Sequence, residues 1–101
     1  MIKNIVITAE LQETTEIDYE DLNTDVIVHL DNGDKYIAAF FSHKNLKSMF
    51  EDDMRSGELF SPGYYKILNG VLVKNVNHAT LLPVIECMIS EGDFQLVFKK
   101  L

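Results

Sequence analysis

The residues with the clearest chemical potential in this sequence are carboxylates near its start. Residues 1–34 hold nine acidic side chains and one lysine, a net charge of −8, whereas residues 35–101 hold seven acidic and eight basic side chains, a net charge of +1. Such an acidic region repels phosphate, so direct binding of nucleic acid is not expected. It attracts a basic protein surface and speeds the encounter with it. The candidate partner-binding residues are Glu13, Glu16, Asp18, Tyr19, Glu20 and Asp21.

A second group of residues predicts a different chemistry. The stretch 56–66 places aromatic side chains and one cation around the turn-forming pair Pro62-Gly63. Tyrosine hydroxyls beside a cation can line a small-molecule pocket or anchor an interface. The alternative is a loop that folds back on the core, with the tyrosines belonging to a strand. The candidate pocket residues are His43, Tyr64, Tyr65, Lys66 and His78.

The sequence lacks the well-marked motifs of enzymes and metal sites. It contains no phosphate-binding glycine loop, no Cys-x-x-Cys pair and no Gly-x-Ser-x-Gly nucleophile elbow. None of the three histidines stands three or four residues from another, so no local spacing suggests a metal site. We therefore expect no cofactor, no metal and no catalysis by the chain itself.

Cysteine usage and hydropathy predict the compartment. Cys87 is the only cysteine, so no disulfide can form within the chain, and a reducing compartment is expected. Its place well inside a predicted helix, beside Glu86, favours a packed and unreactive thiol. The apolar run 5–7 is too short for a secretory signal, and no run approaches the length of a membrane span. We expect a cytoplasmic protein that does not bind membranes.

We expect strands in the first half of the chain to position the acidic residues. Apolar residues make up 47% of the sequence and charged residues 25%, as in one globular domain spanning residues 1–101. Alternation predicts a strand over 4–12, a surface connection over 13–23, and two strands over 25–30 and 35–41. Asn32-Gly33 between the last two predicts a type I′ hairpin turn. The strand 35–41 is apolar on both faces over 36–41, which is typical of a central strand.

Helices and a second hairpin follow. Ser42 is a suitable cap for a helix that Gly57 ends. Asn69-Gly70 predicts a second type I′ hairpin, with strands over 64–68 and 71–76. A second helix, capped by Thr80, would place Pro83 in its first turn and end at Gly92. Residues 93–100 alternate as a last strand. The apolar stripe of the first helix consists of Leu46, Met49, Phe50 and Met54. That of the second helix consists of Leu81, Val84, Ile85, Met88 and Ile89.

The order β-ββα-ββα-β predicts an α+β fold, with a mainly antiparallel sheet of five or six strands and two helices on one face. The other face is left to water or to a partner, and a homodimer through the sheet or an edge strand is one way to cover it. The favoured function is that of a small acidic cytoplasmic protein that binds another, basic protein in an inhibitor-like or immunity-like role. The alternatives are a structural subunit of a homo-oligomer or larger assembly, and a small ligand-binding protein or enzyme.

Overall fold

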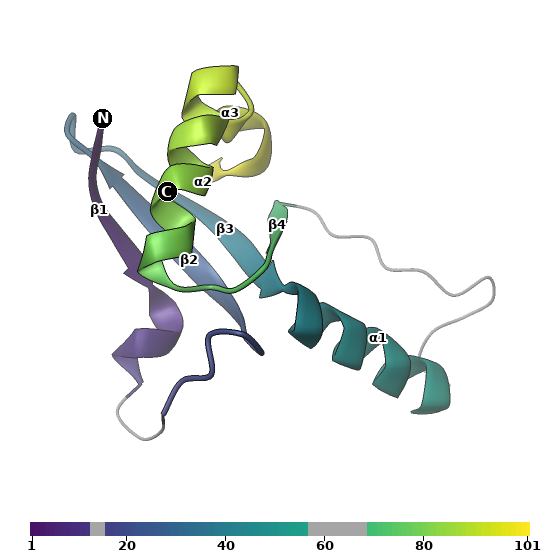
Figure 1. Ribbon diagram of the computed structural model, residues 1–101. Helices are drawn as coiled ribbons and strands as arrows, with labels where there is room; N and C mark the ends of the chain where they lie inside the picture. Colours follow the sequence, from purple (N-terminus) through teal and green to yellow (C-terminus); the bar gives the residue numbers. More distant parts are fainter. Residues whose placement is uncertain (13–15, 57–68) are drawn as a thin grey trace.

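A computed structural model describes residues 1–12, 16–56 and 69–101 (Figure 1). In this part of the chain a twisted sheet carries one long helix against a face, while a second long helix extends from the end of the sheet. The strands are β1 (Ile2–Ile7), β2 (Asn23–Leu30), β3 (Lys35–Ser42), β4 (Gly70–Val73) and β5 (Lys99–Lys100). The helices are the 3-10 helix η1 (Thr8–Leu11) and the α-helices α1 (His43–Ser56), α2 (His78–Glu91) and α3 (Phe94–Val97).

The sheet has the order β1-β2-β3-β4, and β5 also pairs with β3. The β1–β2, β2–β3 and β3–β5 pairs are antiparallel, whereas β4 runs parallel to β3. Strand β3, which is apolar on both faces over residues 36–41, is therefore central, as its composition predicts. The α+β fold, with a mainly antiparallel sheet of five strands and two main helices, is confirmed.

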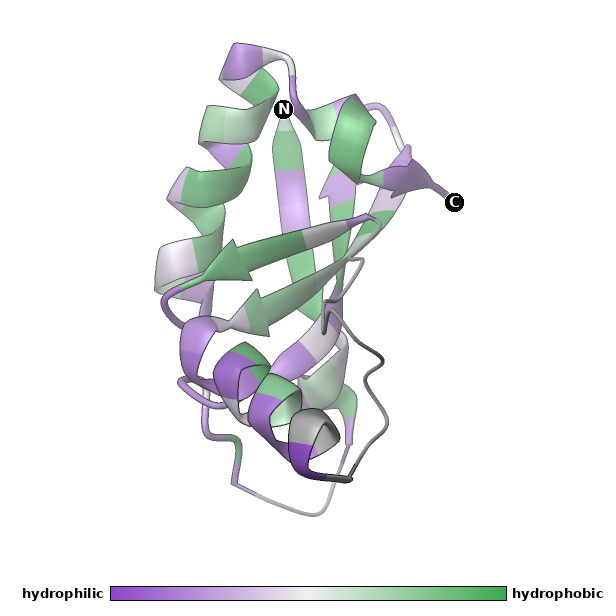
Figure 2. Cartoon of the chain, turned by 90° about the vertical axis from the view of Figure 1, so that its right-hand side faces the viewer, coloured by the Kyte–Doolittle hydropathy of each residue, from purple (hydrophilic) through white to green (hydrophobic). Residues whose placement is uncertain are grey.

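One face of the sheet carries the core. Alternate residues of β1, β2 and β3 are buried, and the register pairs Val26 with Ala38 and Val28 with Tyr36. Helix α2 covers this face with Leu81 and Ile85, both fully buried. Figure 2 shows that the paired parts of β3 and β4 are hydrophobic and lie side by side. The period of two in the strands and the apolar stripe of α2 thus meet in one core.

The first hairpin is present, but its turn is not of type I′. Gly33 has φ of 91°, while Asn32 is not among the described residues with positive φ. The Gly33 N–H donates to the Leu30 carbonyl at 3.0 Å, and the Leu30 N–H donates to the Asp34 carbonyl at 2.9 Å. This is a three-residue loop with a single left-handed residue. The Asn32 side-chain oxygen accepts the Asp34 N–H at 2.9 Å, so Asn32 closes the turn through its side chain.

The predicted type I′ turn at Asn69-Gly70 is wrong. Asn69 has φ of 53°, but Gly70 is the first residue of β4 and is not among the positive-φ glycines of the described chain. β4 pairs with β3, and the predicted partner strand over 64–68 lies outside the described residues. The Asn69 side chain donates to the Val97 carbonyl at 2.8 Å, so this residue ties the start of β4 to the end of α3.

Two predicted strands are shorter than expected because a helical turn replaces their ends. The chain leaves β1 after Ile7 and forms η1, so Leu11 is exposed instead of facing the core. Near the C-terminus, Phe94 and Phe98 are both buried while Leu96 is 79% exposed. The spacing of four between the two phenylalanines fits a helical turn, and their rings stack with centroids 4.4 Å apart.

The predicted N-terminal cap of α1 is confirmed, whereas the predicted N-terminal cap of α2 is wrong. The Ser42 hydroxyl accepts the Asn45 N–H at 3.2 Å, as predicted for the start of α1. Helix α2 begins earlier than expected, because Asn77 rather than Thr80 is its cap and accepts the Thr80 N–H at 2.9 Å. Pro83 therefore lies inside the helix instead of in its first turn. Gly92 ends α2 with φ of 83°, as predicted.

Candidate functional site

The acidic segment, residues 16–22, is fastened to the folded core through its backbone. The Val76 N–H donates to the Tyr19 carbonyl at 2.8 Å, and the Ser42 N–H donates to the Leu22 carbonyl at 2.9 Å. The Leu22 N–H in turn donates to the buried Ser42 hydroxyl at 3.0 Å. Tyr19 and Leu22 also pack against the core cluster. The prediction of a surface connection is correct for these residues, but the connection has fixed partners on β3 and before α2.

Local side-chain bonds shape the same segment. The Asp18 carboxylate accepts the Glu20 N–H at 3.1 Å, and the Asp18 carbonyl accepts the Asp21 N–H at 3.0 Å. This is a turn closed by an aspartate side chain. The Asn45 amide of α1 donates to the Asp21 carboxylate at 3.0 Å. The backbone is thus held within the segment as well as at its ends.

Glu10 lies between two partners that are far apart in the sequence. The Tyr19 hydroxyl donates to one carboxylate oxygen at 2.5 Å, and His78 Nε2 lies 2.8 Å from the other. Both hydrogen bonds lower the pKa of Glu10 because they stabilise the charged carboxylate. The bond from Tyr19 has the larger effect. The same bond raises the pKa of Tyr19, because it is lost when the hydroxyl ionises. The cluster therefore joins η1, the acidic segment and the start of α2.

The predicted partner-binding carboxylates are presented unequally. Glu16, Asp18 and Glu20 are exposed, Asp21 is half-buried, and Glu13 lies outside the described residues. Elsewhere in the acidic region, Asp31 pairs with the N-terminal ammonium at 3.0 Å and Asp34 with Lys100 at 3.5 Å. Within the described ranges, no lysine or arginine pairs with the carboxylates of the acidic segment. Its negative charge is therefore not neutralised by these neighbours.

The residues of the predicted pocket are not brought together by any described contact. Tyr64, Tyr65 and Lys66 lie outside the described residues. His43 is exposed at the start of α1, whereas His78 lies against Glu10. In the described ranges, no hydrogen bond joins the two histidines. His78 is instead part of the cluster that holds the acidic segment.

A hollow beside the acidic segment was not predicted. Its volume is about 350 Å³, and it reaches Leu22 of the acidic segment. Asp25 and Ala39 are register partners in β2 and β3, and their side chains belong to the face opposite the core. The small Ala39, between Ile37 and Phe41, is the sequence signal that could have revealed the space. Further lining residues include Thr8, Gln12 and Asn23.

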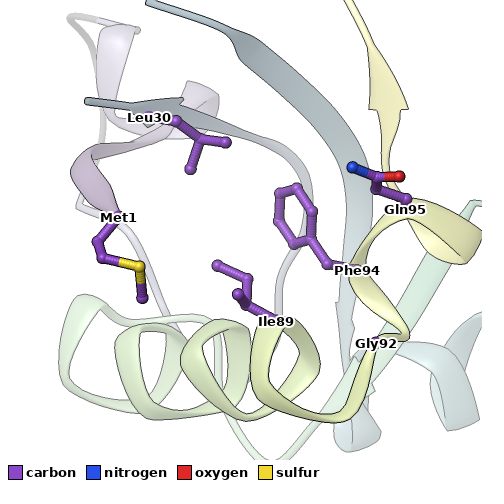
Figure 3. Close-up of a pocket in the computed structure, with 6 residues that line it drawn as sticks. All are labelled: Met1, Leu30, Ile89, Gly92, Phe94 and Gln95. Atoms are coloured by element: carbon purple, nitrogen blue, oxygen red, sulfur yellow. The ribbon is translucent and has the colours of Figure 1, made fainter. Parts of the chain in front are cut away.

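A second, apolar pocket lies on the core side, where the hairpin end, α2 and α3 meet. Figure 3 shows the side chains of Leu30, Ile89 and Phe94 converging from these three elements. Its volume is about 320 Å³, and Met1, Gly92 and Gln95 complete the lining. None of the lining side chains in the described part of the chain is a carboxylate, imidazole or thiol, so these residues provide apolar contact.

Other reactive groups are dispersed. Cys87 is exposed, which corrects the expectation of a packed thiol, and the nearby Glu91 carboxylate raises its pKa, so the nucleophilic thiolate is disfavoured. The described residues contain no group of three or more histidine, cysteine, aspartate or glutamate side chains that could hold a metal ion. The two long described helices, α1 and α2, fall short of the length and apolar character that crossing a bilayer requires.

Comparison of the chain with models of known families, with curated proteins and with solved structures gave no significant match. The site must therefore be interpreted from its own geometry.

Proposed function

We propose that this chain is a small acidic cytoplasmic protein that binds a basic surface of another protein, in an inhibitor-like or immunity-like role and without catalysis of its own. The observation that supports this proposal is the acidic segment, whose backbone is held by Ser42 and Val76 while Glu16, Asp18 and Glu20 remain exposed. The carboxylates are the chemistry expected at a site for lysine and arginine side chains.

The hydrogen-bonded backbone of the acidic segment favours a specific docking surface over a solubilising region. An unstructured acidic stretch would lose conformational freedom on binding, and that loss weakens association. Here part of that loss has already occurred on folding, because the backbone of residues 16–22 is hydrogen-bonded at Tyr19, Asp21 and Leu22. Exposed charges of one sign also steer an oppositely charged partner and raise its association rate about 10- to 1,000-fold.

Affinity capture from the native source, followed by association kinetics, tests the proposal. The charge-neutral variant E16Q/D18N/E20Q keeps side-chain size, and D18N retains a side-chain oxygen that can accept the backbone N–H of residue 20. The control E86Q/E91Q/D93N removes the same charge from exposed residues of α2 and the turn after it. We expect the first variant to lose the captured partner, or to associate with it about three- to tenfold more slowly, with a flatter salt dependence. Equal slowing by both variants, or by neither, would contradict the proposal.

A second function, that of a structural subunit in a homo-oligomer, is supported by one observation. Leu72 is 52% exposed on the face opposite the core, beside its register partner Phe41. Contiguous apolar surface on an open sheet face is the kind of surface that an interface between subunits covers. Sedimentation equilibrium distinguishes this function from the first: a homo-oligomer would dissociate in L72D, whereas a monomeric binder would show one mass for both proteins at all concentrations.

A further inference from the structure

We propose that the hollow next to the acidic segment receives the guanidinium group of an arginine from the partner protein, between the Asp25 carboxylate and the Phe41 ring. This inference rests on the proposed function and names the anchor that the partner would use. Arginine is enriched among the residues that dominate binding energy at interfaces.

The register of the sheet builds the two walls of this site. Asp25 pairs with Ala39, and Phe41 is the next residue of β3 on the same face, where it pairs with Asn23. Asp25 and Phe41 are therefore diagonal neighbours across two antiparallel strands, and such neighbours lie about 7–8 Å apart. The small Ala39, next to both of them, leaves the space between their side chains open. A planar cation that stacks on an aromatic ring lies within about 6 Å of the ring centroid. A guanidinium group stacked on the Phe41 ring can therefore also reach the Asp25 carboxylate.

Two acceptor groups of the hollow, on Asp25 and Asn23, favour a ligand that donates hydrogen bonds. Among the described residues, the Asp25 carboxylate has no ion pair and no side-chain hydrogen bond, and it is the only charged side chain of the described lining. The Asn23 side-chain nitrogen donates to Asn45 at 3.0 Å and to the Met49 sulfur at 3.3 Å. These bonds direct the nitrogen toward α1 and leave the Asn23 oxygen as an acceptor.

Charge and geometry together distinguish arginine from other cations. The guanidinium group carries five N–H donors and no acceptor, binds a carboxylate with two parallel hydrogen bonds, and stacks on aromatic rings. A lysine ammonium lacks the planar shape needed for stacking and for two-point binding. A metal ion would require further carboxylate or imidazole ligands, and the described lining offers a single carboxylate.

The test uses three short capped peptides, Ac-Gly-X-Gly-NH2, in which X is arginine, lysine or citrulline. Citrulline has nearly the shape of arginine without the charge. Backbone amide shifts of the intact protein are followed by NMR during titration. We expect saturable shifts at Thr24, Asp25, Ala39 and Phe41 with the arginine peptide, at least about threefold weaker binding of lysine, and no binding of citrulline.

Three variants separate the parts of the site. D25N should weaken arginine binding about fivefold or more, and F41L about threefold, the size of an exposed cation–π contact. A39V keeps the carboxylate but fills the hollow, so it should abolish the site-specific shifts. E86Q removes one charge from an exposed position of α2 that does not line the hollow, and it should leave arginine binding within about twofold. The amide spectrum of each variant shows whether the fold is retained.

The possible results separate this inference from the proposed function. Equal binding of arginine and lysine, or full binding by A39V, would show that the hollow contributes only charge and would overturn the arginine site. If the captured partner still depended on Glu16, Asp18 and Glu20 in that case, the proposed function would stand without it. Conversely, arginine binding in the hollow with no effect of E16Q/D18N/E20Q on the partner would reject the acidic segment as the docking surface.

Discussion

The substitution Ser42→Ala should cost more stability than the loss of one small polar group suggests. Ser42 is fully buried at the end of β3, and its hydroxyl accepts two backbone N–H groups, from Leu22 at 3.0 Å and from Asn45 at 3.2 Å. Alanine keeps the backbone bond from the Ser42 N–H to the Leu22 carbonyl but leaves both of these donors without their acceptor. One side chain thus anchors the acidic segment and the start of α1.

The expected loss follows from the two orphaned donors. Removing a helix cap costs about 1 kcal/mol. Leaving the partly buried Leu22 N–H unsatisfied costs about 1–2 kcal/mol more. The free energy of unfolding should therefore fall by about 2–3 kcal/mol, which corresponds to a decrease in Tm of about 10–15 °C for a chain of this length. Such a loss is a large part of the usual total of about 5–15 kcal/mol.

Urea unfolding followed by far-UV circular dichroism measures this loss. Ser48→Ala is the matched control, because Ser48 is an exposed residue of α1, and its substitution should change stability by less than about 0.5 kcal/mol. Hydrogen exchange of the Leu22 amide should also accelerate in S42A and not in S48A. A loss below about 0.5 kcal/mol in S42A, or unchanged exchange at Leu22, would refute the view that this hydroxyl fastens the acidic segment.

Three other parts of the fold lead to predictions of the same kind. Because the pKa of Glu10 is lowered in the fold, its carboxylate stabilises the protein above the unfolded value of about 4.5, and this contribution is lost as the pH falls through the folded-state pKa. Urea midpoints between pH 7 and pH 3 should therefore fall less steeply in E10Q than in the wild type, and parallel profiles would contradict this. Pro83→Ala restores an N–H inside α2 and should raise stability by about 1 kcal/mol or more in thermal unfolding; a lower Tm would show that the helix depends on the proline. Lys3 lies at a register shift in β1, the outermost strand of the described sheet order. Charge and irregularity at a sheet edge are features that oppose pairing with another chain. K3V should make the sedimentation coefficient rise with protein concentration, and a constant value would indicate that the edge is protected in another way.

The sequence alone predicted the features that depend on neighbouring residues. The period of two in β2 and β3, the apolar stripe of α2 and the left-handed Gly92 are local patterns, and all three are present. The Ser42 cap is equally local, since the donor it satisfies lies three residues along the chain. Charge placement also required no fold, and the exposed carboxylates Glu16, Asp18 and Glu20 lie in the region that the sequence marked as acidic.

The tertiary structure decided the features that join distant parts of the chain. Phe94, Leu96 and Phe98 alternate as in a strand, yet contacts of Phe94 with Tyr36 and of Phe98 with Phe40 favour the helical turn that buries both rings. The parallel pairing of β4 with β3 likewise depends on a long connection that no local pattern specifies.

The candidate site shows the same division. Glu10 and His78 are 68 positions apart, and the hollow exists because Asp25 is in register with Ala39. Turns, caps and periodicity are set by residues within a few positions of one another, so the sequence determined them. Registers and long-range hydrogen bonds are chosen by the free energy of the whole packed core, so only the tertiary structure could decide them.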